Sequence, residues 1–313
     1  MFASASRRAA ALLGCVAAAA SAASLSASQS RGAAAPADAG RLAAVGAENE
    51  YADVIAQVGG RFVTVSAIES NPNADPHSFE ASPSVAREVA AASLIVQNGL
   101  GYDSYMDRIE SGSPSPRRRV IDVQALLRLP DSTPNPHLWY APSTMPAVAA
   151  AVAADLAALA PAHASYFRAN AAAFDRSLQP LRAALRALPS RHAHVPVAVT
   201  EPVGDYLLAA AGADVLTPAR FQDDIMNGVD PAPQDVSIEQ SLLAGRRVRA
   251  FLYNRQVTDS LTESLLADAA RARIPVVALY ETMPAGYHYQ SWMLAEVRAL
   301  DRAVSSGVST DQL

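Results

Sequence analysis

Two of the six histidines in the chain, His77 and His137, directly follow a proline, in the segments DPH and NPH. Proline fixes its own φ and restricts the residue before it, so each imidazole starts from a constrained backbone. Imidazole is a common metal ligand. A single histidine in a proline-rich loop is more often a turn residue, but the repeated setting also fits a pair of ligands.

Two carboxylates, Glu201 and Glu281, each directly follow an apolar run that predicts a strand. His77 and His137 also follow predicted strands, by longer loops. In open α/β sheets ligands bind just beyond the carboxyl ends of strands, so these four side chains could meet at one site. Each glutamate could instead be a capping residue, since an anion is favoured near a helix N-terminus.

The sequence gives little support for other kinds of functional site. The single cysteine, Cys15, lies near the N-terminus, so the rest of the chain has neither a disulfide nor a thiolate metal site. The chain contains no phosphate-binding loop, no G-x-S-x-G and no H-E-x-x-H. We expect His163, His192 and His194 to be exposed. His288 lies nearer to the proposed site, and we expect it to be at most a neighbour.

Short apolar runs alternate with amphipathic stretches, which predicts an α/β fold with parallel sheets. We expect two α/β lobes with four-stranded sheets, residues 40–158 and 191–309, joined by one long helix over 159–190. Pro180 predicts a kink or break in that helix. The predicted strands are 42–46, 62–68, 93–97 and 119–122 in the first lobe, and 195–200, one near Val215, 250–253 and 275–280 in the second.

The N-terminal segment 1–35 predicts a signal peptide followed by a disordered start. Arg7 and Arg8 precede an apolar stretch that ends in small residues and serines. The sequence LLGC around Cys15 resembles a lipobox, so a lipoprotein is an alternative to a soluble periplasmic form. The net charge of -5 argues against a nucleic-acid partner.

Several segments together resemble one protein family: NPNADPHSFEASPS, LIVQNGLGYDSYMD, NPHLWYAP, VTEPVGDYLLAAAG, FLYNRQ and IPVVALYETMP. The chain resembles the zinc- and manganese-specific substrate-binding proteins of bacterial ABC importers, the cluster A-I type, over nearly its whole mature length. The resemblance implies metal ligands at His77, His137 and Glu201. It implies a fourth at Glu281, where the family more often has aspartate, and a one-residue slip would select Tyr280 instead.

The resemblance implies a periplasmic monomer that captures Zn²⁺ or Mn²⁺ as transported ligand between its lobes and delivers it to an ABC importer permease with its ATPase. Two imidazoles and two carboxylates suit Zn²⁺, Mn²⁺ or Fe²⁺. Four protein ligands leave little room for a substrate water, so we expect binding without catalysis. A metal-dependent hydrolase and a surface adhesin of the same fold are the alternatives.

Overall fold

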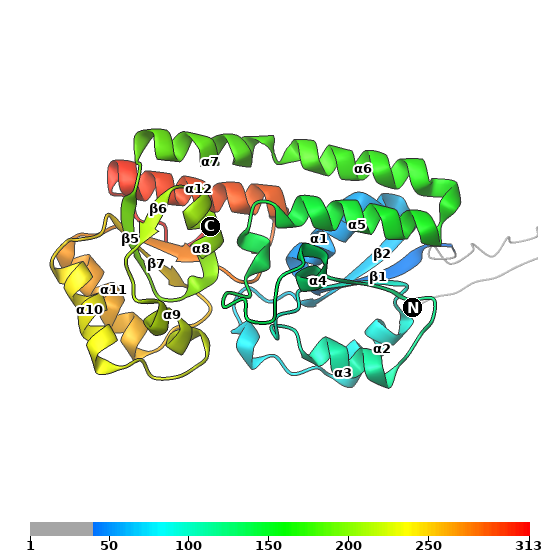
Figure 1. Ribbon diagram of the computed structural model, residues 1–313, viewed down its shortest axis with the longest axis horizontal. Coiled ribbons are helices and arrows are strands. Elements are labelled where there is room, and N and C mark those ends of the chain that lie inside the picture. The colour runs from blue at the N-terminus through cyan, green and yellow to red at the C-terminus, as the bar shows by residue number, and fades with distance from the viewer. Residues whose placement is uncertain (1–39) are drawn as a thin grey trace, which may run out of the picture. The chain divides into compact units, whose positions relative to one another are not determined.

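Eight strands form two separate parallel sheets in the computed structural model, which describes residues 40–313 (Figure 1). The sheet orders are β2-β1-β3-β4 and β6-β5-β7-β8. The predicted two-lobe α/β fold with four strands in each sheet is confirmed. The predicted signal peptide, the predicted disordered start and Cys15 lie outside the described residues. The strands are β1 (Leu42–Glu48), β2 (Val63–Glu69), β3 (Leu94–Gln97), β4 (Arg119–Asp122), β5 (Val195–Val199), β6 (Ala213–Val215), β7 (Ala250–Asn254) and β8 (Val276–Leu279).

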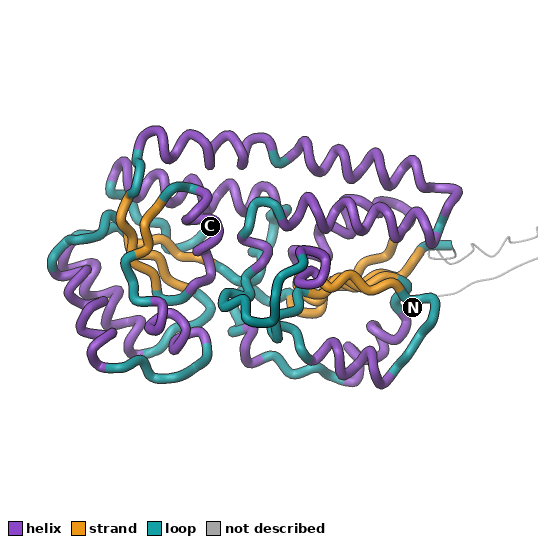
Figure 2. The backbone as a smooth tube through the Cα atoms, in the orientation of Figure 1, coloured by secondary structure: helices purple, strands orange, loops and turns teal. Residues whose placement is uncertain are grey.

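The central strands are strongly apolar, as expected for parallel sheets that are covered on both faces. In the two sheets (orange in Figure 2), every residue of the inner strands β3 and β7 is buried, as are the last five residues of β1. The edge strand β8 is also buried throughout. Gly46 in β1 allows the close approach of the following helix, since a Cβ there would lie 2.3 Å from the backbone nitrogen of Ala52. The sheets therefore form rigid supports for the loops at their carboxyl ends.

Several helices begin with the sequence signals expected for helix starts. Ser82 accepts a hydrogen bond from the backbone N–H of Val85, and Asp259 accepts one from that of Thr262. The N-terminal lobe contains α1 (Asn49–Gly59), α2 (Pro83–Ala91), α3 (Tyr105–Gly112), α4 (Val123–Leu127) and α5 (Thr144–Leu159). The C-terminal lobe contains α8 (Asp205–Ala210), α9 (Ala219–Met226), α10 (Pro233–Ala244), α11 (Ser260–Ala272) and α12 (Tyr289–Ser306).

Two consecutive helices, α6 (Ala164–Ser177) and α7 (Gln179–Arg191), connect the lobes (Figure 1). The prediction of a kink or break at Pro180 is confirmed, because the interruption falls at Leu178 and the proline occupies the first turn of α7. Helix α6 packs on α5 and α1, whereas α7 packs on α12. Within residues 40–313, no helix is both long and apolar enough to cross a membrane.

Candidate metal centre

The two Pro-His segments fold in the same way at their backbone. The Asp75 side chain accepts a hydrogen bond from the backbone N–H of His77 at 2.8 Å, and the Asn135 side chain accepts one from that of His137 at 3.0 Å. Both are turns closed by the side chain of an Asp or Asn two residues earlier. The sequences DPH and NPH therefore build one local device twice, which fixes the backbone from which each imidazole projects.

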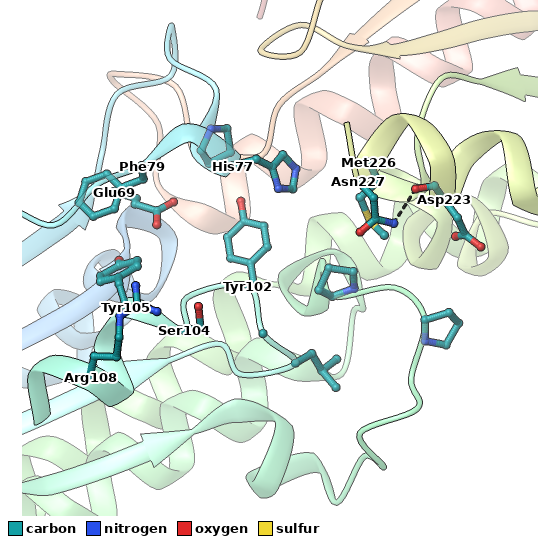
Figure 3. Close-up of a pocket in the computed structure, with 15 residues that line it drawn as sticks. Glu69, His77, Phe79, Tyr102, Ser104, Tyr105, Arg108, Asp223, Met226 and Asn227 are labelled. Carbon is teal, nitrogen blue, oxygen red and sulfur yellow. Dashed lines mark hydrogen bonds between the residues drawn. The ribbon is translucent and has the colours of Figure 1, made fainter. Parts of the chain in front are cut away.

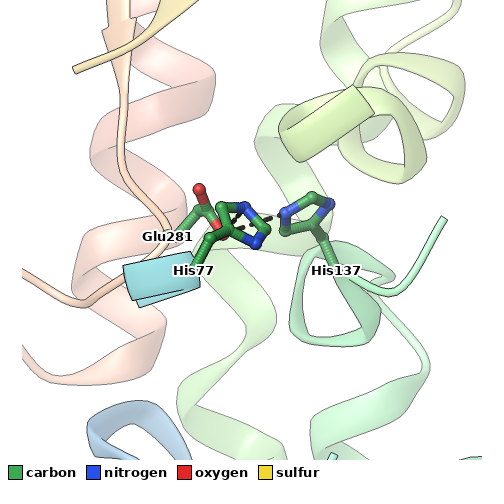
Figure 4. Close-up of side chains that lie close together, drawn as sticks. All are labelled: His77, His137 and Glu281. Carbon is green, nitrogen blue, oxygen red and sulfur yellow. Dashed lines mark hydrogen bonds and ion pairs between the residues drawn. The ribbon is translucent and has the colours of Figure 1, made fainter. Parts of the chain in front are cut away.

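Three of the four predicted ligands lie together between the lobes (Figure 4). One ligand atom each from His77, His137 and Glu281 lies within 4.8 Å of the other two. Glu281 Oε2 is 3.1 Å from His137 Nε2 and 3.4 Å from His77 Nε2. A tetrahedral Zn²⁺ with bonds of about 2.1 Å holds its ligand atoms about 3.4 Å apart, so this spacing suits a metal ion.

His137 is fully buried, and its ring orientation is set by Asn135. The Asn135 amide donates to the carbonyl oxygen of Pro202 at 2.6 Å, which leaves its Oδ1 facing the imidazole Nδ1 at 2.9 Å. Oδ1 can only accept, so Nδ1 carries a proton and donates it. Nε2 is then the nitrogen directed at Glu281, as in metal sites where a second hydrogen bond selects the tautomer.

The Glu281 carboxylate is held from both lobes. Asn254, at the end of β7, donates to Oε1, and the Tyr102 hydroxyl donates to Oε2 at 2.8 Å. Burial alone would raise the pKa of Glu281, but the hydrogen bonds and charges of His137 and His77 outweigh it and hold the pKa well below its usual range. Glu281 is therefore an anion at neutral pH, as a metal ligand must be.

Glu201 lies next to this group without joining it. The residue is 2% exposed, and neither carboxylate oxygen makes a hydrogen bond of ordinary geometry within residues 40–313, although the Asn254 side chain is close enough to lower its pKa. Burial and the negative charge of Glu281 raise its pKa to about 8, with His77 opposing the shift. A buried carboxyl with two unpartnered oxygens is costly unless a cation or a donor reaches it. Its position beside the other three predicted ligands fits a fourth ligand.

His77 differs from the other predicted ligands because its side chain is 31% exposed. Burial lowers its pKa, but the hydrogen bond and charge of Glu281, with further charges from Glu201 and Asp75, raise the pKa to about 9. The imidazole is thus cationic near neutral pH in the metal-free protein. A metal ion must displace that proton before Nε2 can bind it.

His77 also lines a cavity of about 540 Å³ that lies between the lobes (Figure 3). Tyr102 and Glu69 from the N-terminal lobe face it, and Asp223 and Asn227 from the region of α9 border it from the other lobe. The cavity contacts none of the other three predicted ligands. Because those are buried, the cavity gives solvent its access to the site past the His77 ring.

Hydrogen bonds across the lobe interface fix the segments that carry the buried ligands. The Tyr140 hydroxyl donates to the carbonyl oxygen of Tyr280, and the Tyr289 hydroxyl donates to that of Trp139, each at 2.7 Å. The Asn49 side chain both donates to and accepts from the backbone of Met283, at 2.8 and 2.9 Å. These bonds lie within three residues of His137 or Glu281, so the buried part of the site is rigid before any ligand binds.

The structure also places the residues that were considered as alternatives or neighbours of the site. Glu281 lies with the two histidines, whereas the buried side chain of Tyr280 lies by Arg255 and the backbone of Leu313. His194 is exposed as expected, and exposed His288 bonds Asp53 rather than the site. The prediction that His163 and His192 are exposed was wrong, because both are half-buried. The His163 ring stacks on Phe62, with centroids 3.7 Å apart.

Four residues that support the site were missed as candidates from the sequence: Tyr102, Asn135, Asn254 and Gln256. Asn135 stands in the NPH segment, where its parallel with Asp75 was a usable signal. Asn254 and Gln256 alternate at the carboxyl end of β7, the position from which side chains reach a ligand site. Tyr102 follows a glycine-rich turn and has no comparable local signal.

Comparison with known proteins identifies the class to which this fold and site correspond. The model of the family described as "ZnuA: Zinc-uptake complex component A periplasmic" matches residues 45–303. The chain belongs to this family.

Individual relatives are more distant. The structure is similar to FpvC of Pseudomonas aeruginosa, solved with Ni²⁺, at 23% identity and a TM-score of 0.67, covering 86% of this chain and 99% of that one. It is similar to the periplasmic zinc-binding protein TroA of Treponema pallidum at 20% identity and a TM-score of 0.68, covering 86% and 100%. A curated Thermotoga maritima protein whose name refers to metal binding is 34% identical over 98 residues, 30% of this chain and only 33% of that protein.

Proposed function

We propose that this protein is a periplasmic substrate-binding protein that captures a divalent transition metal between its lobes and delivers it to an ABC importer, a permease with its ATPase. One observation carries the proposal. His77, His137 and Glu281 come from segments far apart in the chain, yet their ligand atoms lie within 4.8 Å of one another. Membership of the zinc-uptake family supports the same function, as does the similarity to FpvC, solved with Ni²⁺, and to the zinc-binding protein TroA.

The ligands proposed are His77 and His137 through Nε2, with Glu201 and Glu281 through their carboxylates. Such a set suits Zn²⁺ and Mn²⁺ and lacks the soft thiolate that would select other metals. Zn²⁺ is favoured by raw affinity in the Irving–Williams order. A carboxylate that binds through both oxygens raises the coordination number, which Mn²⁺ tolerates better than Zn²⁺. Both ions are therefore proposed as cargo.

The proposed function involves no turnover. A catalytic metal keeps a position open for water, whereas four protein ligands would fill a tetrahedral site. We further propose lobes over residues 40–158 and 191–309 with the connecting helices between them, and a monomer that presents the outer faces of both lobes to the permease.

Metal analysis tests this function directly. The protein is purified without chelator, its metal content is measured, and Zn²⁺ and Mn²⁺ are titrated into the metal-free form against a competing chelator. We expect one ion per chain and a large loss of affinity in His137→Ala, because that imidazole is buried between the other ligands. His194→Ala is the matched control, since that imidazole is exposed and contacts Asp214 at 3.2 Å, not a predicted ligand. Equal affinity in both variants would refute the site.

A further inference from the structure

Gln256 makes a full set of hydrogen bonds immediately behind the proposed metal site. Its Oε1 accepts from the backbone N–H groups of Glu281 and Thr282, at 2.7 and 2.9 Å. Its Nε2 donates to the Thr282 hydroxyl at 3.1 Å and to the carbonyl oxygen of Ala74 at 2.7 Å. An amide has two donors and two acceptor sites, so all of its capacity is used.

These partners also fix which way the amide points. Two N–H groups face one end of the amide and two oxygens face the other, so the oxygen and nitrogen cannot exchange places. The Gln256 backbone N–H donates to Asn254 Oδ1 at 2.9 Å, and Asn254 in turn donates to the Glu281 carboxylate. Gln256 therefore stabilises the Glu281 backbone directly and its carboxylate through Asn254.

The bond to Ala74 connects the two lobes through the loop that carries His77. Ala74 precedes His77 by three residues. The other hydrogen bonds of residues 71–78 in the described part of the chain stay within this loop, apart from the contact of His77 itself with Glu281. Cavities of about 540 and 290 Å³ border the loop, both against Pro76. Among the described residues, the bond from Gln256 to Ala74 is thus the one hydrogen bond, besides the contact of His77 with Glu281, that ties residues 71–78 to the other lobe.

We infer that Gln256 is a positioning residue that ties the His77 loop to Glu281 and so controls how long the site retains its ion. This inference rests on the proposed function. The buried ligands are fixed by interlobe hydrogen bonds of their own, whereas His77 depends on Gln256 to stay opposite Glu281. Loss of the amide frees the loop, and the ion then leaves past His77.

The test combines one variant at Gln256 with a variant at the residue through which it acts. Gln256→Met keeps the side-chain length and loses every hydrogen bond of the amide. The dissociation rate of Zn²⁺ is measured by stopped flow into excess chelator, and the visible absorption spectrum of the Co²⁺-loaded protein reports the ligand geometry. We expect release to be about tenfold faster, or 1.4 kcal/mol, because one of the lost bonds, the one to Ala74, joins Gln256 to the His77 loop.

The same substitution is then made in His77→Ala. If Gln256 acts through His77, Gln256→Met has little further effect on release in that background, because coupled residues are not additive. Gln57→Met is the matched control: this half-buried glutamine of α1 donates to Asp53 at 2.6 Å and to Gln290 at 3.1 Å, and neither partner is a predicted ligand. We expect it to lower stability and leave release unchanged. Should Gln256→Met fail to fold, Gln256→Asn, whose shorter amide cannot reach both lobes, replaces it.

The outcomes separate this inference from the proposed function. Unchanged release and an unchanged Co²⁺ spectrum in Gln256→Met overturn the inference and leave the metal site intact. An effect of equal size with and without His77 also overturns it, since Gln256 would then act through Glu281 alone or on general stability, and not through the His77 loop. Failure of the unmodified protein to bind Zn²⁺, Mn²⁺ or Co²⁺ overturns the proposed function itself.

Discussion

Asn135 offers the sharpest test of how the site is prepared for a metal. Its Oδ1 accepts from the His137 backbone N–H and from Nδ1, and its amide donates to the carbonyl oxygen of Pro202, which follows Glu201. Asn135→Ala removes all three hydrogen bonds. It leaves the imidazole of His137 in place but free to rotate and to change tautomer.

The expected loss follows from the role of these bonds. Removing an outer partner of a ligating histidine typically costs about 10- to 100-fold in metal affinity. Asn135 also carries the bond to Pro202, so we expect the upper part of this range, near 100-fold or about 2.7 kcal/mol. The protein should also lose about 1–3 kcal/mol of stability, because the Pro202 carbonyl is left without its donor in a buried setting.

Competitive titration of Zn²⁺ into the metal-free variant measures the affinity, and urea unfolding measures the stability. Asn170→Ala is the matched control, because that asparagine donates to the Val58 carbonyl oxygen at 3.0 Å in a part of the molecule remote from the site. It should lose stability without losing affinity. If Asn135→Ala binds Zn²⁺ as tightly as the unmodified protein, the tautomer argument is wrong.

Three further predictions concern the site and its surroundings. Tyr102→Phe removes the hydroxyl that donates to Glu281, and we expect Zn²⁺ affinity in a competitive titration to fall by about 3- to 10-fold; no change would show that the hydroxyl is dispensable. Burial, partly offset by hydrogen bonds from Trp292 and Tyr140, raises the pKa of Glu296 from 4.5 to about 8. The stabilisation from protonated Glu296 is therefore complete below about pH 4.5 and declines as the pH rises to about 8. Glu296→Gln should reduce the fall in the free energy of unfolding, measured with urea, over this pH interval. An unaltered pH profile would contradict the raised pKa of Glu296. Adding Zn²⁺ at 100 times its Kd should raise the free energy of unfolding by about 2.7 kcal/mol, and a chelator should reverse this in thermal melts; insensitivity to both would mean that the ion does not stabilise the folded state.

The fold was largely predictable because its signals are local. Buried parallel strands such as Val276–Leu279 read as continuous apolar runs, and the loops between them carry glycine and proline. The break between α6 and α7 followed from Pro180, whose ring cannot continue a preceding helix. One expectation was too simple, since the predicted single connecting helix is two helices separated at Leu178.

The site could be predicted only in part, because its supporting contacts are not local. The structure brings His77, His137 and Glu281 together, as expected for groups at the carboxyl ends of strands, while their role as ligands stays a prediction. Tyr102 meets Glu281 across 179 residues, and Gln256 meets Ala74 across 182. No periodicity or spacing along the chain encodes such pairs.

The most direct test of the account is a crystal structure of the protein grown with Zn²⁺ or Mn²⁺, with anomalous diffraction recorded at the absorption edge of the metal. The account predicts one ion between the lobes, bound by Nε2 of His77 and His137 and by the carboxylates of Glu201 and Glu281. Bond lengths should be about 2.0–2.2 Å for Zn²⁺. An anomalous peak elsewhere on the protein, with these four side chains unbound, would contradict it.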